Sequence, residues 1–206
     1  MDSDMIFNSL ANIRIAIDNN KDEIEKLDQK IGDGDHIFNI QRGITEALEM
    51  REVLNDEKPK DILKKIGLKI MTTIGGSSGA LFATLLMAMA KKFNESLNDQ
   101  ENVAEMFLEG VNAMKKRGKS DIGEKTMLDV LIPVSKILIE NKSERDISVL
   151  AKSVIEAAKN GMLSTKNMIA TKGRASFLGE RAKGHVDPGA RSSQLAIEAI
   201  CNQFIK

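Results

Sequence analysis

Apolar residues recur along this sequence with the three-to-four-residue spacing of amphipathic helices. Val103, Met106 and Phe107 begin one such stripe, which continues through positions 110, 111 and 114. The same spacing covers residues 37–48, 147–158 and 197–204, and each stretch predicts a helix with one apolar face. Runs of alternating β-branched or aromatic residues, which would indicate strands, do not stand out in the sequence. The pattern therefore predicts an all-α protein of roughly eight helices.

One predicted helix contains a proline. Met127, Leu131, Val134 and Leu138 follow the helical spacing, and Pro133 lies among them. Proline lacks a backbone N–H, and its ring clashes with the preceding turn of a helix. Position 133 therefore predicts a kink or the start of a helix.

Composition limits the partners that this chain is expected to have. Its 206 residues suit a single domain, residues 1–206, with a sizeable core. Lys+Arg and Asp+Glu number 30 each, so we expect neither a nucleic acid nor a membrane surface as partner. The apolar run from Ala80 to Ala90 is too short to cross a bilayer and predicts a buried helix.

Two further features favour a cytoplasmic location. The single cysteine, Cys201, lies in an apolar periodic stretch and has no second cysteine for an internal disulfide, so we expect a small core residue. The first residues lack the basic segment followed by an apolar one that a signal peptide requires.

The strongest chemical signal is a short acidic segment. Asp28, Asp33 and Asp35 place three carboxylates within eight positions, with Gly32 and Gly34 among them. Their charges repel one another unless a cation lies between the oxygens. Hard oxygen donors on a chain that glycines allow to bend are what Mg²⁺ or Ca²⁺ requires. The alternative is a solvated acidic turn between two helices.

Other metal sites fit the sequence poorly. In an EF-hand that began at Asp33, Ile37 and Phe38 would occupy the positions that need an oxygen donor and a glycine. A zinc site is not expected either, because His36, His185 and Cys201 lack the spacing of zinc ligands.

Two segments interrupt the helical pattern. Residues 72–79 join two apolar stretches, and Ser77 and Ser78 are expected to cap the following helix and leave amides free for a phosphate. A plain capped junction is the alternative. Residues 170–190 form a long, glycine-rich, basic connection, a type that tends to be functional or disordered. Its cations would complement phosphates held through metal at the acidic segment.

Four ordered motifs together carry a resemblance to a known family. They are Asp28-x4-Asp33-Gly-Asp35-His36, Gly75-Gly76-Ser-Ser-Gly79, Gly123-Glu-Lys-Thr-Met127-Leu-Asp129, and Gly173-Arg174-Ala-Ser-Phe-Leu-Gly179-Glu-Arg181 followed by His185-Val-Asp187-Pro188-Gly189. In this order they resemble the L subunits of bacterial dihydroxyacetone kinases, which bind the nucleotide. The resemblance extends over most of the chain.

The resemblance implies a fold and a set of site residues. Family members fold as a closed barrel of about eight antiparallel amphipathic helices, with the nucleotide at one rim. By similarity, Asp28, Asp33 and Asp35 would bind two Mg²⁺, and Arg174 and His36 would be catalytic. The nucleotide contacts that it implies are His36, Ile37, Phe38, Asn39, Ser77, Ser78, Gly118, Met127, Arg174, Asp187, Pro188 and Gly189.

The resemblance also implies partners. In the phosphoenolpyruvate-dependent branch, tightly bound ADP is phosphorylated to ATP by a phosphocarrier M subunit of the phosphotransferase system. The γ-phosphoryl then passes to dihydroxyacetone on a separate K subunit. A homodimer is a further possibility.

Several positions depart from the family pattern and leave alternatives open. Ile37 and Phe38 stand where the family has smaller residues, so the pair is expected to narrow the phosphate site or to change partner packing. Arg191 replaces a small polar residue. The alternatives are a kinase subunit for another ketose or polyol, one that takes ATP from solution, a nucleotide-bound regulator of a transcription factor, and a helical interaction protein.

Overall fold

The computed structural model describes residues 1–74 and 76–205 and consists of helices and connecting loops. The α-helices are α1 (Ser3–Asn19), α2 (Lys21–Ile31), α3 (His36–Leu48), α4 (Arg51–Leu54), α5 (Pro59–Thr73), α6 (Gly76–Lys92), α7 (Asp99–Gly118), α8 (Leu128–Glu140), α9 (Ile147–Ser164) and α10 (Pro188–Cys201). Three 3₁₀ segments, η1 (Thr165–Asn167), η2 (Arg174–Ala182) and η3 (Asn202–Phe204), follow α9 and α10.

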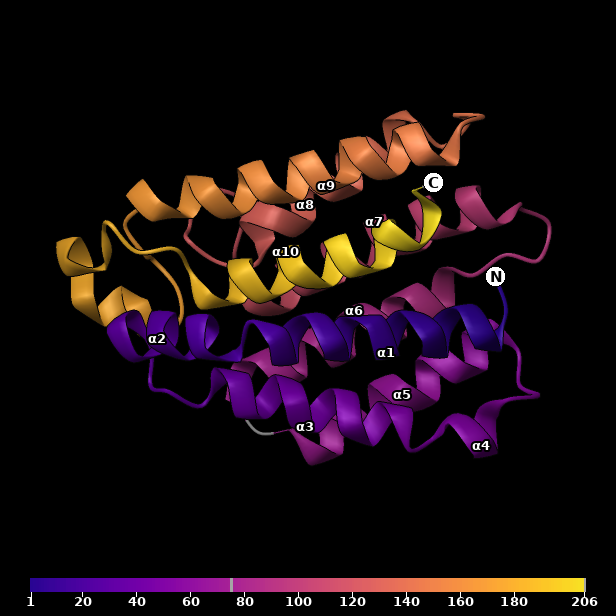
Figure 1. Cartoon of the computed structure of the whole chain (residues 1–206), viewed down its shortest axis with the longest axis horizontal. Coiled ribbons are helices and arrows are strands. Elements are labelled where there is room, and N and C mark those ends of the chain that lie inside the picture. The colour runs from indigo at the N-terminus through magenta and orange to yellow at the C-terminus, as the bar shows by residue number, and fades with distance from the viewer. Residues whose placement is uncertain (75, 206) are drawn as a thin grey trace.

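The long helices form a closed ring. Going round it, α1 packs against α3, α3 against α5, and then α5, α6, α7, α8, α9 and α10 follow in chain order, with α10 returning to α1. Neighbouring helices run in opposite directions, and α2 continues α1 beyond the end of the barrel (Figure 1). Within the described residues, the prediction of an all-α closed barrel of about eight antiparallel helices is therefore confirmed.

The helices begin at residues that satisfy the first free amides. The Asp2 side chain accepts from the amide of Met5, and Asn98 forms a capping box with Glu101. Pro59 occupies the first turn of α5, where its missing N–H costs nothing. Local sequence thus determines where these helices of the barrel begin.

The predicted apolar stripes face the interior of the barrel. In α7, Met106, Val111 and Met114 are buried. The stripe residues of α3, α9 and α10 are buried or half-buried except Ile147, the first residue of α9, which is 42% exposed. Cys201 packs against the α8–α9–α10 part of the core as a half-buried residue, and burial raises the pKa of its thiol to about 12. Among the described residues, no helix is long and apolar enough to cross a membrane.

Pro133 lies inside α8, five residues after its first residue, so α8 continues through the proline. The helix starts upstream of it, at Leu128. Pro133 has no N–H for the carbonyl of Asp129, four residues earlier. On the facing helix, a Cβ added to Gly161 would lie 2.2 Å from that carbonyl oxygen, so only glycine allows α9 to approach so closely.

The barrel brings the N-termini of four helices to one rim. The first residues of α3, α6, α8 and α10 all lie at the end where α2 projects (Figure 1). Each helix N-terminus carries free amides and a partial positive charge. This rim is therefore suited to an anionic ligand.

Candidate functional site

The three acidic residues of the first motif converge at this rim. Asp28 lies on α2 and is 3% exposed, whereas Asp33 and Asp35 lie exposed on the bend between α2 and α3. One oxygen from each carboxylate falls within 4.8 Å of the other two. The predicted ligand set is thus assembled in space, which a solvated acidic turn alone does not require.

Two glycines shape this bend for different reasons. A Cβ on Gly32 would lie 1.8 Å from Oδ1 of Asp28, so this position must be glycine to leave room for the carboxylate. Gly34 has open space around it, but its φ of 81° is one that other residues rarely adopt. Gly32 therefore provides space and Gly34 provides the turn.

His36 connects the acidic segment to α10. Its backbone N–H donates to Oδ2 of Asp28 at 3.0 Å, and its ring Nε2 lies 3.0 Å from Oγ of Ser192. Burial lowers the pKa of the imidazole, and the negative charge of Asp28 opposes this effect. Because the ring is buried against α10, it links the acidic segment to that helix, and the catalytic role that the resemblance implies for His36 stays a prediction.

The residues after His36 point in different directions. The Ile37 side chain is fully buried with Ile17, Ile24 and Leu195, so the expectation that it narrows the phosphate site was wrong. Phe38 is 57% exposed, and its ring lies 5.8 Å from Nζ of Lys21. Asn39 is half-buried. A nucleotide at the rim would reach Ile37 only through its backbone.

The predicted phosphate loop opens α6. Helix α6 begins at Gly76, so Ser77 and Ser78 lie in its first turn and the prediction that they are capping residues was wrong. Ser77 is exposed and Ser78 half-buried, at the rim where phosphate is expected. Gly75 of the same motif lies outside the described residues.

Residues from α6, α7, α10 and the connection before α8 meet in an apolar region of the rim. A Cβ on Gly118, the last residue of α7, would lie 3.3 Å from Leu81 of α6. Leu81 also packs against the cluster that contains Met127. On the other side, a Cβ on Gly189 would lie 3.5 Å from Cε of Met127. Three of the predicted nucleotide contacts, Gly118, Met127 and Gly189, are thereby brought into one region.

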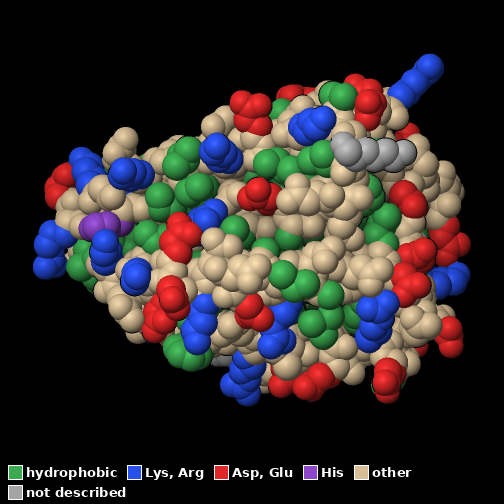
Figure 2. All heavy atoms as spheres, in the orientation of Figure 1, with side chains coloured by type: hydrophobic (Ala, Val, Ile, Leu, Met, Phe, Trp, Pro, Cys, Tyr) green, Lys and Arg blue, Asp and Glu red, His purple; other side chains and the backbone are tan. Residues whose placement is uncertain are grey.

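The basic connection after α9 folds over the acidic segment. Instead of an irregular loop, residues 174–182 form η2, which packs against α2 through Ala175, Ala182 and Ile31. Arg174 is exposed, and its Nε lies 2.7 Å from Oδ2 of Asp33. Figure 2 shows basic side chains gathered at this end of the molecule. Arg174 and the acidic residues are therefore neighbours, as the sequence predicted.

A buried lysine, which the sequence analysis left without a role, lies behind this region. Lys125 is 1% exposed, and its Nζ donates to the backbone carbonyls of Thr165 and His185, at 2.5 Å each. Asp129 is equally buried and accepts from the amides of Gly123 and Thr126. Only their place in the third motif could have signalled them, because periodicity does not distinguish a buried lysine from an exposed one.

The Asp187-Pro188-Gly189 turn starts α10. The carboxylate of Asp187 accepts from the amide of Ala190 at 2.8 Å and caps the helix, with Pro188 in its first turn. Burial raises the pKa of Asp187 to about 7, although the positive charge of Lys125 works against this shift. Burial likewise lowers the pKa of Lys125.

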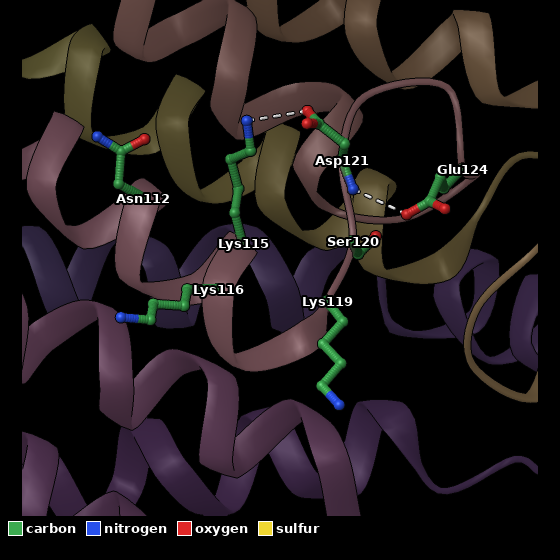
Figure 3. A pocket seen from close by; sticks show the side chains of 7 residues that line it. All are labelled: Asn112, Lys115, Lys116, Lys119, Ser120, Asp121 and Glu124. Carbon is green, nitrogen blue, oxygen red and sulfur yellow. Dashed lines mark hydrogen bonds and ion pairs between the residues drawn. The ribbon is translucent and has the colours of Figure 1, made fainter.

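The outer face of the α7–α8 connection is hollowed. The hollow, of about 440 Å³, is lined by Asn112, Lys115, Lys116, Lys119, Ser120, Asp121 and Glu124 (Figure 3). Lys115 pairs with Asp121 at 3.0 Å, and Glu124 accepts from the amide of Asp121. Its lining includes none of the predicted site residues, so the hollow lies outside the site assembled at the rim.

The donor set fits divalent cations and a nucleotide phosphate. Carboxylate oxygens are the ligands that Mg²⁺ prefers, and Asp28, Asp33 and Asp35 approach closely enough to share ions. The helix N-termini and Arg174 supply positive charge for phosphate oxygens. The apolar residues around Met127 suit the face of a base.

Comparison with known proteins gives consistent relatives. The DAK2 domain matches residues 30–202. The ADP-binding subunit of a PEP-dependent dihydroxyacetone kinase from Listeria innocua is 38% identical over 97% of this chain and 96% of its own length. The corresponding ADP-binding subunit from Escherichia coli is 39% identical over 84% of each chain.

A solved structure shares the fold. The dihydroxyacetone kinase of C. freundii, in complex with AMP-PNP and Mg²⁺, superposes with a TM-score of 0.75 at 22% identity and covers 96% of this chain. This chain spans 33% of that longer protein. Because the family match and the relatives extend over nearly the whole sequence, the chain belongs to the DAK2-domain family, together with the ADP-binding subunits of bacterial dihydroxyacetone kinases.

Proposed function

We propose that this chain is the ADP-binding phosphotransfer subunit of a dihydroxyacetone kinase and that it acts in the cytoplasm as a single domain. The observation that carries the proposal is the convergence of the Asp28, Asp33 and Asp35 oxygens within 4.8 Å at a rim of helix N-termini. The family relatives, named as ADP-binding subunits, support the same assignment.

Asp28, Asp33 and Asp35 are proposed to hold two Mg²⁺. When bound, such ions neutralise phosphate oxygens and stabilise the charge that develops during phosphoryl transfer. The protein contributes a rigid anchor, because Asp28 is buried and accepts from the amide of His36. His36 is proposed as the positioning residue of this anchor, since its ring contacts Ser192 of α10.

The remaining predicted contacts are proposed to hold tightly bound ADP or ATP. The first turn of α6, with Ser77 and Ser78, offers amides to phosphate, and the region of Gly118, Met127 and Gly189 accepts the base. Phosphoryl transfer depends mainly on positioning and charge neutralisation. Arg174, whose guanidinium already lies beside Asp33, would add positive charge over the transferring group.

The partners follow from the same assignment. The phosphoryl donor is proposed to be the phosphocarrier M subunit of the phosphotransferase system, and the acceptor to be dihydroxyacetone on a K subunit. Since this chain offers no well-placed base among the described site residues, the group that activates the acceptor hydroxyl is assigned to the K subunit.

The test is nucleotide content and turnover of purified protein. The chain has no Trp and no Tyr, so absorption at the adenine band is easily seen against its seven Phe residues. Asp33→Ala is expected to lose bound nucleotide, and with it the stabilisation that a ligand of the folded state provides. Asp22→Ala, at an exposed carboxylate in the first turn of α2 and outside the acidic cluster, serves as the matched control.

Reconstitution with K and M subunits and phosphoenolpyruvate then tests transfer. Wild type and Asp22→Ala should form dihydroxyacetone phosphate, and Asp33→Ala should not. Equal nucleotide content in all three proteins would refute the assignment of the site. Bound nucleotide without turnover would refute the kinase and favour a regulatory subunit.

A further inference from the structure

Lys125 is an unusual residue for the inside of a protein. Its side chain is 1% exposed, whereas lysine is almost never fully buried unless it is paired. Its ammonium is surrounded by oxygen, since it donates to the carbonyls of Thr165 and His185 and is influenced by the charges of Asp187 and Asp129. A buried cation with this many partners acts as a connector between the segments that supply them.

The connected segments are distant in sequence. Lys125 lies in the connection between α7 and α8, with a φ of 60° that non-glycine residues rarely adopt. Thr165 follows α9, and His185 precedes α10. The two hydrogen bonds of Lys125 therefore tie the α7–α8 connection to both ends of the α9–α10 connection.

The hydrogen bonds around Lys125 extend to the region assigned to the base. The Thr165 hydroxyl accepts from the amide of Asp187 at 3.1 Å, so the turn that begins α10 is held from the same point. Gly189 of that turn lies against Met127, two residues after Lys125 in the chain. The separation between Met127 and Gly189 is thus set by the bonds of Lys125 and Thr165.

We propose that Lys125 is a positioning residue that fixes Met127 against the Asp187-Pro188-Gly189 turn and so holds the nucleotide base in the closed site. A methionine would fill the same volume without the cost of burying a charge. The ammonium instead orients two carbonyls that otherwise would lack a shared donor. This inference rests on the proposed function, since it assigns a role in holding the same nucleotide.

The test compares Lys125→Met with Lys116→Met. Lys116 is exposed at the outer hollow of the same connection, and in Figure 3 its side chain points away from the loop. The rate at which ADP leaves the protein is measured in Mg²⁺ by displacement of a fluorescent ADP analogue, well below the melting temperature of each variant. Lys125→Met is expected to raise this rate about 10- to 100-fold, the range found for residues that orient a ligand shell. Lys116→Met should leave it unchanged.

Restoring the amine separates positioning from mere folding. Lys125→Cys in a Cys201→Ala background, alkylated with bromoethylamine in denaturant and refolded, carries an ammonium at nearly the original position. Slow ADP release should return in the aminoethylated protein and not in protein capped with an ethyl group. If Lys125→Met does not fold, Lys125→Gln, which keeps a donor but lacks the charge and reach, is measured in its place and should also release ADP faster.

The possible outcomes separate a failure of the proposed function from a failure of the role of Lys125. Wild-type protein that does not bind ADP would overturn the proposed function. Wild-type protein that binds ADP, together with a folded Lys125→Met or Lys125→Gln variant that releases it at the wild-type rate, would overturn the role of Lys125 alone. A lower melting temperature with unchanged release would do the same, because a purely structural lysine predicts that result.

Discussion

Gly32→Ala offers a direct probe of the acidic site, because the substitution leaves all three carboxylates in the sequence. The added Cβ would lie 1.8 Å from Oδ1 and 2.9 Å from Cγ of Asp28. To restore an ordinary contact of 3.4 Å, that oxygen must retreat by about 1.6 Å. Metal–oxygen distances tolerate only about 0.2 Å of variation, so a shift of this size removes Asp28 as a ligand.

Losses of similar size are expected in binding and in folding. Losing one oriented ligand should weaken Mg²⁺-dependent ADP binding by at least about 10- to 100-fold, or about 1.4–2.7 kcal/mol. The bond from His36 N–H to Asp28, 3.0 Å long, would also be strained, at a cost of about 1–3 kcal/mol. For a chain of this size we therefore expect the melting temperature to fall by roughly 2–12 °C.

Isothermal titration with ADP in Mg²⁺ measures the first effect, and circular dichroism at 222 nm measures the second. Gly34→Ala is the matched control, because its φ of 81° makes alanine strained while nothing lies within 4 Å of the new Cβ. Gly34→Ala should lower the free energy of unfolding by about 1–2 kcal/mol, and with it the melting temperature, and should keep ADP binding. Wild-type affinity in Gly32→Ala, or an equal loss in both variants, would refute the steric argument.

Three other substitutions should act on the scaffold. In Gly161→Ala the new Cβ would lie 2.2 Å from the Asp129 carbonyl oxygen, and this clash should lower the free energy of unfolding by about 1–3 kcal/mol. The higher helix propensity of alanine returns about 1 kcal/mol, and the melting temperature measures the net change. The pKa of Asp187 is raised to about 7, so the folded state keeps this proton up to a higher pH than the unfolded state. The free energy of unfolding should therefore fall as the pH rises from 4 to 7, and it should fall less in Asp187→Asn. Arg191→Ser, which removes the two-pronged contact with Glu23, should cost about 1 kcal/mol, more at low salt, without changing ADP affinity.

Controls make these expectations specific. At Gly43 the added Cβ would also meet a neighbour at 2.2 Å, but that neighbour is the end of the Ile74 side chain, which can rotate. Gly43→Ala should therefore be tolerated where Gly161→Ala is not. Equal melting temperatures for the two would count against the backbone clash. Parallel pH curves for wild type and Asp187→Asn, or weaker ADP binding in Arg191→Ser, would contradict the other two expectations.

The sequence predicted most of the fold because helical periodicity is local. The stripes in α3, α7 and α9 follow from spacing alone, whereas Pro133, which predicted a kink or a helix start, lies inside a helix that begins at Leu128. What periodicity leaves open is the order in which helices meet. The contact of α10 with α1 closes the ring and brings the two ends of the chain together. The sequence predicted this closure only through the resemblance to a known family.

The site was predicted in part, for a related reason. The cluster of Asp28, Asp33 and Asp35 lies within one short segment, so its convergence needs few long-range contacts. The role of Lys125 depends on carbonyls 40 and 60 residues away, which no local pattern reveals. Ile37 was expected to narrow the phosphate site, but its side chain is buried by Ile17, Ile24 and Leu195 of other helices, which no local pattern reveals.

In the proposed site, the acidic segment binds divalent cations, and these in turn hold the nucleotide. Native mass spectrometry of the protein with ADP and Mg²⁺ tests it most directly, since it counts both ligands in one complex. We expect a species that carries one ADP and two Mg²⁺ and that loses the nucleotide when EDTA removes the metal. ADP that stays bound in EDTA, or that binds Asp33→Ala as it binds wild type, would show that these cations do not hold the nucleotide.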